Sequence, residues 1–244
     1  MKAYFVSAWY SGLRSRSFHA VFVLGLIVIA GAYLAALFSP RQPETVALDV
    51  GLSGMRFVLI LLALYWVQDL VGKEIERRTS IIYLAYPLPR AHYVLGRYTA
   101  IAVLLLIASL ILGILLWLAV FAASEGYQQA HHGALGLPYW TTILGVWLDA
   151  LVVAAFSLCI ATLSTIPVLP LALGVAFAIA GRSLGVVVDY LTHGADGHQE
   201  LVQNFGPVIQ LSRWVLPDLS RLDWRIWPMY DVTPPTDDLD GSRP

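Results

Sequence analysis

The sequence predicts an all-α, polytopic membrane protein, and two observations support that prediction. Hydrophobic residues make up 58% of the 244 residues and charged residues only 13%, which is unusual for a soluble domain because its surface must be polar. Apolar runs of about 20 residues also recur, and a helix of that length crosses a hydrocarbon core of about 30 Å. We therefore expect a single transmembrane domain, residues 1–244, with about five spanning helices.

The elements can be assigned in chain order. Residues 1–16 place aromatic and small residues on one helical face beside basic residues, which predicts an amphipathic helix in the membrane interface, with a frayed tail as the alternative. We expect transmembrane helices at residues 20–38, 52–71, 98–123, 139–164 and 167–188. Prolines at 167 and 170 suit the start of the last of these helices.

The chain after the fifth predicted span does not read as another spanning helix. Residues 205–222 are partly apolar but contain Pro207 and Pro217, and Trp224, Trp227 and Tyr230 follow. This pattern predicts a re-entrant or interfacial hairpin on the outer side, anchored by aromatic rings. The Pro- and Asp-rich residues 235–244 are predicted to be disordered.

The distribution of basic residues predicts the orientation. Cytoplasmic flanks carry an excess of Lys and Arg. The opposite short loops, 39–51 and 124–138, contain only Arg41, whereas the N-terminal region and residues 72–97 contain eight basic residues: Lys2, Arg14, Arg16, Lys73, Arg77, Arg78, Arg90 and Arg97. The N-terminus and residues 72–97 are therefore predicted to be cytoplasmic.

Several kinds of chemistry find little support. The net charge of −1 and the lack of a long basic stripe give no sign of nucleic-acid binding, and the single Cys159 cannot form an intramolecular disulfide. The pairs His131-His132 and His193/His198 lack ligand spacing, so we expect solvated histidines, with metal binding as the alternative. The chain contains no G-x-x-x-x-G-K-[ST] phosphate loop, and we expect it to hold no cofactor.

Three ionisable residues lie inside predicted spans. Such residues are costly in a membrane and usually face a partner or a water-filled cavity. Asp149 and Arg182 can pair if their helices are neighbours, and Arg56 lies at a similar depth. We expect a structural ion pair, with a role in a substrate pathway as the alternative.

The sequence Gly181-Arg-Ser-Leu-Gly185 matches a hydrolase pattern, G-x-S-x-G. That motif acts only where a sharp strand-to-helix turn exposes the serine, and here it falls inside a predicted membrane helix. Two small residues four apart instead favour close helix packing. An intramembrane hydrolase with Ser183 as nucleophile, and His193 or His198 as base, is the enzymatic alternative.

Residues 72–97 carry a distinctive pattern between two apolar runs. Two acidic residues are followed by Arg-Thr, a short apolar stretch, prolines, Arg, Tyr and then Gly-Arg. Glu74 and Arg78 are spaced as a stabilising i, i+4 helical pair. This pattern resembles the cytoplasmic segment between the second and third spans of type-2 ATP-binding-cassette (ABC) transporter permeases. The amphipathic N-terminus, the long third span and the sequence Leu216 to Asp223 resemble the same family.

The resemblance implies a transport subunit rather than an enzyme. It implies a bacterial inner-membrane protein that works with a second permease copy and a cytoplasmic ABC ATPase, which would bind the ATP and Mg²⁺. Residues 72–97 would contain the coupling helix that docks on this ATPase, through Glu74, Glu76, Arg77, Arg78, Thr79, Pro87 and Arg90. A membrane scaffold that recruits a cytoplasmic partner without transport is the other alternative.

The family usually has six spans, whereas about five are predicted here. We expect either a five-span protein with an outer C-terminus, or a sixth helix that this sequence lacks or another chain supplies. The mostly apolar spans do not identify the transported substrate.

Overall fold

The computed structural model describes residues 6, 9–10, 16–39, 41–72, 90–124, 133–164, 166–192, 217 and 219–230. These residues form helices and turns without any strand, which confirms the all-α fold for this part of the chain. The long helices are α2 (Arg16–Leu37), α3 (Pro43–Val67), α6 (Arg90–Ser124), α7 (Leu137–Leu163) and α8 (Leu169–Thr192). A π-helix, η1 (Gln68–Gly72), continues α3, and a 3-10 helix, η3 (Leu219–Leu222), precedes the short α10 (Ile226–Tyr230).

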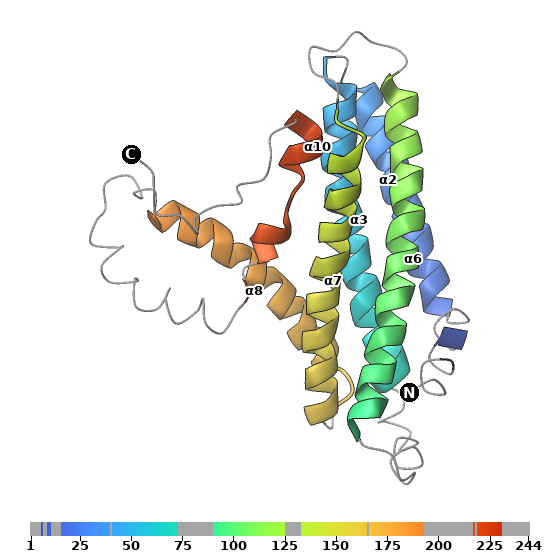
Figure 1. Ribbon diagram of the computed structural model, residues 1–244, viewed down its shortest axis with the longest axis vertical. Coiled ribbons are helices and arrows are strands. Elements are labelled where there is room, and N and C mark those ends of the chain that lie inside the picture. The colour runs from blue at the N-terminus through green and yellow to red at the C-terminus, as the bar shows by residue number, and fades with distance from the viewer. Residues whose placement is uncertain are drawn as a thin grey trace.

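Helix α3 is at the centre of the fold. It packs against α2, α6, α7 and α8, and most of its side chains are buried. Helices α2, α3, α6 and α7 lie side by side as an up-and-down bundle, whereas α8 leans away from α7 (Figure 1). The short elements η3 and α10 lie beside α7, with η3 against α8 (Figure 1).

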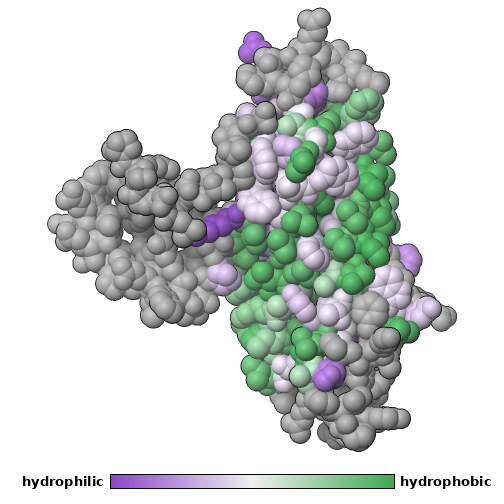
Figure 2. All heavy atoms as spheres, viewed as in Figure 1, coloured by the Kyte–Doolittle hydropathy of each residue, from purple (hydrophilic) through white to green (hydrophobic). Residues whose placement is uncertain are grey.

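Three helices, Pro43–Gly72, Ala91–Ala123 and Leu137–Leu163, are long and apolar enough to cross a membrane. The stretches Val21–Leu37 and Leu169–Ser183 are apolar helices of shorter length. Apolar side chains cover much of the bundle face in view (Figure 2). These features indicate a membrane protein, while the expected number of five crossings stays a prediction.

Helices α3 and α6 begin eight or more residues earlier than the hydropathy of the sequence indicates. Helix α3 starts at Pro43, nine residues before the expected span, so most of the predicted loop 39–51 is helical. A proline in the first turn and an acidic Glu44 both suit a helix N-terminus. The carboxylate of Glu44 is buried and accepts a 2.7 Å hydrogen bond from the amide of Gly133, which ties this end of α3 to the residues before α7.

Helix α6 begins at Arg90, inside the segment predicted as the cytoplasmic region 72–97. Arg97, which the charge pattern placed in that region, is almost completely buried. Its guanidinium carbon lies 5.6 Å from the ring centroid of Tyr93, a cation–π arrangement that favours a buried arginine. Residues 90–97 are therefore part of the third long helix rather than of a separate segment.

Helices α6 and α7 are antiparallel and held in register by aromatic side chains. In each contact, a ring hydroxyl or indole N–H of one helix donates to a backbone carbonyl of the other. The pairs are Tyr98 to Leu151 (3.3 Å), Trp147 to Ala102 (3.1 Å) and Tyr139 to Gly113. Because these pairs are spread along both helices, a shift of one helix along the other would break all of them.

Helices α7 and α8 are tightly packed near the turn that joins them. Ser157 donates a 2.9 Å hydrogen bond to the carbonyl of Pro170. The rings of Phe156 and Phe177 are stacked with centroids 4.1 Å apart. Gly174 leaves room for Leu64 of α3, so α8 begins in contact with both α7 and α3.

Some predicted segments fall outside the described residues. Of residues 1–16, the structure describes only Val6, Trp9, Tyr10 and the backbone of Arg16, and Trp9 packs against the bundle core. Most of the predicted hairpin 205–222 and all of the tail 235–244 lie outside as well.

The approach of α2 to α3 depends on Gly54, and this gives a stability prediction. A Cβ at Gly54 would collide with Val28 of α2, a β-branched residue with little rotamer freedom. We expect Gly54→Ala to lower the free energy of unfolding by about 1–3 kcal/mol, the usual cost of overpacking. Thermal unfolding of the purified protein in detergent measures the loss.

Gly31→Ala is the matched control for this prediction. Gly31 lies within α2, and a Cβ added there would have no neighbouring atom within 4 Å. Alanine is the better helix former, so this variant should be as stable as the parent or slightly more stable. Equal melting temperatures for the two variants would show that Gly54 does not limit the packing.

Candidate functional site

Six charged residues of alternating sign follow one another through the bundle, and we refer to them as the charge chain. Its members come from α8, α7, α3 and the residues between η3 and α10, in the order Arg182, Asp149, Arg56, Asp223, Arg225 and Asp49. Three are basic and three are acidic, so the charge chain is neutral as a whole.

Asp149 is the most buried member of the charge chain. Its side chain is 0% exposed, and its Oδ2 atom accepts a hydrogen bond from Nη2 of Arg182 and lies 3.5 Å from Nε of Arg56. Asp149 is twelve residues, or about 18 Å, from the start of α7. Arg56 is thirteen residues, or about 20 Å, into α3. Both charges therefore lie near the middle of spanning helices.

Arg56 connects Asp149 to the C-terminal elements. Its Nη1 lies 2.6 Å from Oδ2 of Asp223, and its Nη2 donates a 3.3 Å hydrogen bond to the carbonyl of Leu222. Only 4% of the Arg56 side chain is exposed, so most of its charge is compensated by protein groups.

The ionisation of Asp223 reflects this pairing. Burial by itself raises the pKa of the Asp223 carboxyl, but hydrogen bonds and charge from Arg56 and Arg225 outweigh burial and hold the pKa below its ordinary value. A lowered pKa in the folded state stabilises the fold above the unfolded value of about 3.9. This contribution is present at neutral pH and is lost as the pH falls through the lowered pKa.

The charge chain becomes more exposed toward the start of α3. Nε of Arg225 lies 2.8 Å and 3.0 Å from the two carboxylate oxygens of Asp223, and its Nη1 lies 3.1 Å from Oδ1 of Asp49 and also contacts Ser53. Arg225 is 32% exposed and Asp49 is 54% exposed. Solvent screening weakens exposed pairs, so we expect the buried part of the chain to contribute more to stability.

Residues 219–230, which we call the docked segment, are also fastened by uncharged contacts. The hydroxyl of Thr142 donates to the carbonyl of Trp224 over 3.1 Å, and Gly145 leaves room for the Trp224 ring. The amide of Ala134 donates to the carbonyl of Pro228 over 2.9 Å. The docked segment therefore joins α7, α3 and the residues before α7.

The structure brings together all three ionisable residues that the sequence analysis selected inside the spans. Arg182 and Asp149, which were expected to pair if their helices are neighbours, form an ion pair, and Arg56 joins them. The sequence analysis missed the other three members of the charge chain, Asp223, Arg225 and Asp49. Asp223 and Arg225 are two residues apart just after η3, a spacing that is not typical of a helical pair. Only the tertiary structure brings them close to Arg56.

The G-x-S-x-G pattern has a different environment from the one a hydrolase needs. Gly181 lies beneath Leu219 and the carbonyl of Pro217, so its missing side chain makes room for η3 rather than for another spanning helix. Ser183 is exposed and donates a 3.0 Å hydrogen bond to the carbonyl of Ile179 within its own helix. Its hydrogen bond is thus of the ordinary helical kind, and His193 and His198 lie outside the described part of the chain.

The proposed docking residues cannot be placed in the same way. Glu74, Glu76, Arg77, Arg78, Thr79 and Pro87 lie outside the described residues, and Arg90 is described only as the first residue of α6. The structure does show where this region is attached. It begins directly after η1 and ends at the start of α6.

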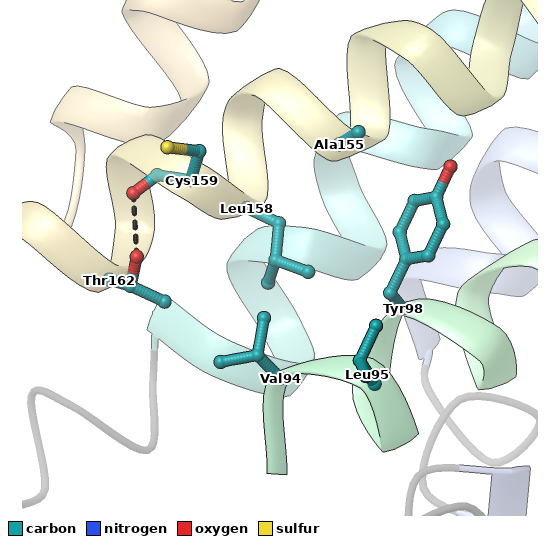
Figure 3. Close-up of a pocket in the computed structure, with 7 residues that line it drawn as sticks. All are labelled: Val94, Leu95, Tyr98, Ala155, Leu158, Cys159 and Thr162. Carbon is teal, nitrogen blue, oxygen red and sulfur yellow. Dashed lines mark hydrogen bonds between the residues drawn. The ribbon is translucent and has the colours of Figure 1, made fainter. Parts of the chain in front are cut away.

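An apolar groove lies between α6 and α7. It is lined by Val94, Leu95, Tyr98, Ala155, Leu158, Cys159 and Thr162 (Figure 3) and has a volume of about 260 Å³. The Tyr98 hydroxyl is bonded to the carbonyl of Leu151, and the thiol of Cys159 points away from the other lining side chains (Figure 3). The groove offers an apolar surface but no reactive cluster.

Metal ligation finds no support in the part of the chain that the structure describes, where no three His, Cys, Asp or Glu residues gather. His131, His132, His193 and His198 lie outside that part. Comparison of the chain with models of known protein families and with curated proteins finds no match. Membership of the ABC permease family therefore stays a prediction.

The buried and exposed parts of the charge chain should differ in their effect on the docked segment. We expect Asp223→Asn to speed hydrogen–deuterium exchange of amides in residues 219–230 at neutral pH by at least about tenfold, because it removes the charge that Arg56 requires. Exchange is measured by mass spectrometry of the protein in detergent or nanodiscs.

Asp49→Asn is the matched control, because it neutralises an exposed acidic residue of the charge chain. An exposed ion pair is worth about 0–1 kcal/mol, so exchange in residues 219–230 should change by no more than a few-fold. Equal exchange rates in the two variants would contradict the assignment of Asp223 as the main attachment of this segment.

Proposed function

We propose that this chain is the membrane-spanning permease subunit of an ABC transporter in a bacterial inner membrane. It has five spans and a cytoplasmic N-terminus, and a separate cytoplasmic ATPase docks on residues 72–97 and drives it. Two sequence features support the proposal. Residues 72–97 resemble the cytoplasmic segment of type-2 ABC permeases, and basic residues are more frequent on the predicted cytoplasmic side of the membrane than on the opposite side. The charge chain is the structural observation that carries it, because charged groups near the middle of membrane helices commonly mark a transport path.

The connections of residues 72–97 suit a coupling role. Residues 73–89 of this segment lie between η1, the π-helical end of α3, and Arg90, the first residue of α6. Helix α3 also carries Arg56, which contacts both Asp149 and Asp223. A displacement of the residues between η1 and α6 can therefore reach the charge chain along a single helix, α3.

The π-helix η1 is a suitable place for such a displacement to enter α3. A π-helical turn is locally strained and often occurs at functional sites. Gly72, its last residue, is packed against the side chain of Gln68, and Leu70 and Val71 are buried. Movement of residues after Gly72 would therefore be transmitted to the packed end of α3 rather than lost in a loose loop.

The chemistry of ATP hydrolysis belongs to the partner in this proposal. The ATPase supplies the nucleotide site and its Mg²⁺, and a second permease copy completes the transport path. Closing and opening of that path requires α3, α7, α8 and the docked segment to change their contacts around Asp149. The permease itself performs no covalent step.

Docking can be tested by changing the proposed contacts together. We expect the combined substitutions Glu74→Ala, Arg77→Ala and Arg78→Ala to abolish co-purification of the partner ABC ATPase when the two proteins are co-expressed. Loss of several paired charges at an interface typically costs several kcal/mol, enough for about a thousandfold weaker complex. Pull-down through a tag on the permease, with immunoblotting, measures the complex.

Arg41→Ala is the control for this experiment, because Arg41 is basic but predicted to lie on the opposite side of the membrane. It should leave the complex intact. Complex formation that survives the triple substitution would contradict docking on residues 72–97, and a stable complex without any transport would favour the scaffold.

The predicted orientation can be tested with single cysteines in a Cys159→Ser background. Gln42 lies between α2 and α3 and Ile166 lies between α7 and α8, and both are exposed. In intact cells, a membrane-impermeant thiol reagent should label Gln42→Cys, whereas Ile166→Cys should require permeabilisation. The opposite pattern would show that the N-terminus is outside.

A further inference from the structure

Three polar atoms around Asp149 are buried and have no hydrogen-bond partner among the residues that the structure describes. They are Oδ1 of Asp149, Nε of Arg56 and Nε of Arg182. The three side chains meet at a single point, because Oδ2 of Asp149 contacts both arginines. We call this meeting point the Asp149 junction.

The three atoms without a hydrogen bond are one acceptor and two donors. Oδ1 of the carboxylate can only accept a hydrogen bond when ionised, and each guanidinium Nε–H can only donate. Buried polar groups are rarely left without a partner, because their lost hydration must be replaced. A molecule that completes the junction must therefore both donate and accept hydrogen bonds.

The balance of charge at the junction argues against an ion. Two positive groups, Arg56 and Arg182, are matched by two negative groups, Asp149 and Asp223. An anion that reached either Nε–H would also face the carboxylate of Asp149. A cation that reached Oδ1 would face both guanidinium groups. A neutral dipolar group meets neither repulsion.

We propose that the Asp149 junction is a binding site for a neutral hydroxyl-bearing group, occupied by water in the resting protein. The O–H donates to Oδ1 of Asp149, and the oxygen accepts from Nε of Arg56 or Arg182. Two or three polar partners lie within the range of about two to four hydrogen bonds that a buried water makes. The organic source of the same chemistry is an alcohol or polyol hydroxyl, which can replace the water.

The exposure of the three residues indicates how the site is reached. Asp149 and Arg56 are almost completely buried, whereas 35% of the Arg182 side chain is exposed. Arg182 comes from α8, the helix that leans away from the bundle (Figure 1). Arg182 is therefore the member of the junction nearest the protein surface, and movement of its side chain can admit a small molecule to the buried atoms. The hydration of the junction does not depend on the proposed transport function.

Paired cysteine variants in membrane-embedded protein test this proposal. In a Cys159→Ser background, Arg182→Cys faces the junction, whereas Ser183→Cys is the next residue of the same helix and is also exposed. Reagents of the methanethiosulfonate class react with the thiolate, which forms in water. We expect a water-soluble reagent to modify position 182 faster than position 183 by about tenfold or more. Equal or slower modification at position 182 would overturn the proposal.

The same assay separates the two sources of the hydroxyl group. Glycerol is the probe for organic hydroxyls. If glycerol slows labelling at position 182 but not at position 183, the site binds both water and organic hydroxyl groups. If glycerol slows neither, the site binds water alone.

The unsubstituted protein provides an independent measurement, which also covers an Arg182→Cys variant that fails to fold. An experimental structure at a resolution that resolves water should show density within hydrogen-bond distance of Oδ1 of Asp149 and of one arginine Nε. Density for an ion, or a direct protein donor on Oδ1, would contradict the proposal. The proposed permease function is tested separately by loss of the ATPase complex. A negative result for the Asp149 junction therefore does not contradict the permease function, and the reverse also holds.

Discussion

The buried carboxylate of Asp149 limits how the helices around it can be arranged. An unpaired charge in an apolar interior is so costly that it must find partners. Arg56 of α3 and Arg182 of α8 provide them, so both helices have to lie against α7 at the same level. Breaking such a buried pair by removing one partner typically costs about 3–5 kcal/mol.

The same requirement explains why the docked segment enters the bundle. Two arginines around one carboxylate leave an excess of positive charge, which Asp223 balances by pairing with Arg56. Because Asp223 is far from α3 in sequence, this pairing holds the C-terminal elements against the middle of the bundle. Gly145 and Gly181 make the approach possible, since side chains at these positions would meet the segment.

Helix α3 links the two regions that the proposed function requires. Its π-helical end precedes the residues on which the ATPase is proposed to dock, and its middle carries Arg56. Its other end is tied through Glu44 to the residues before α7. A helix held at its far end and in its middle can transmit a displacement from η1 to the charge chain, which is the mechanical requirement for coupling.

The sequence alone determined the helical class, because long apolar runs admit few other structures in a membrane. It also selected Asp149, Arg182 and Arg56, since charge within an apolar run stands out in any sequence. It placed the starts of α3 and α6 too late, because Glu44 and Arg97 are polar by composition but buried by their tertiary contacts. Only the tertiary structure decided that Asp223 and Arg225 complete the charge chain, because ion pairing acts through space and leaves no local pattern along the chain.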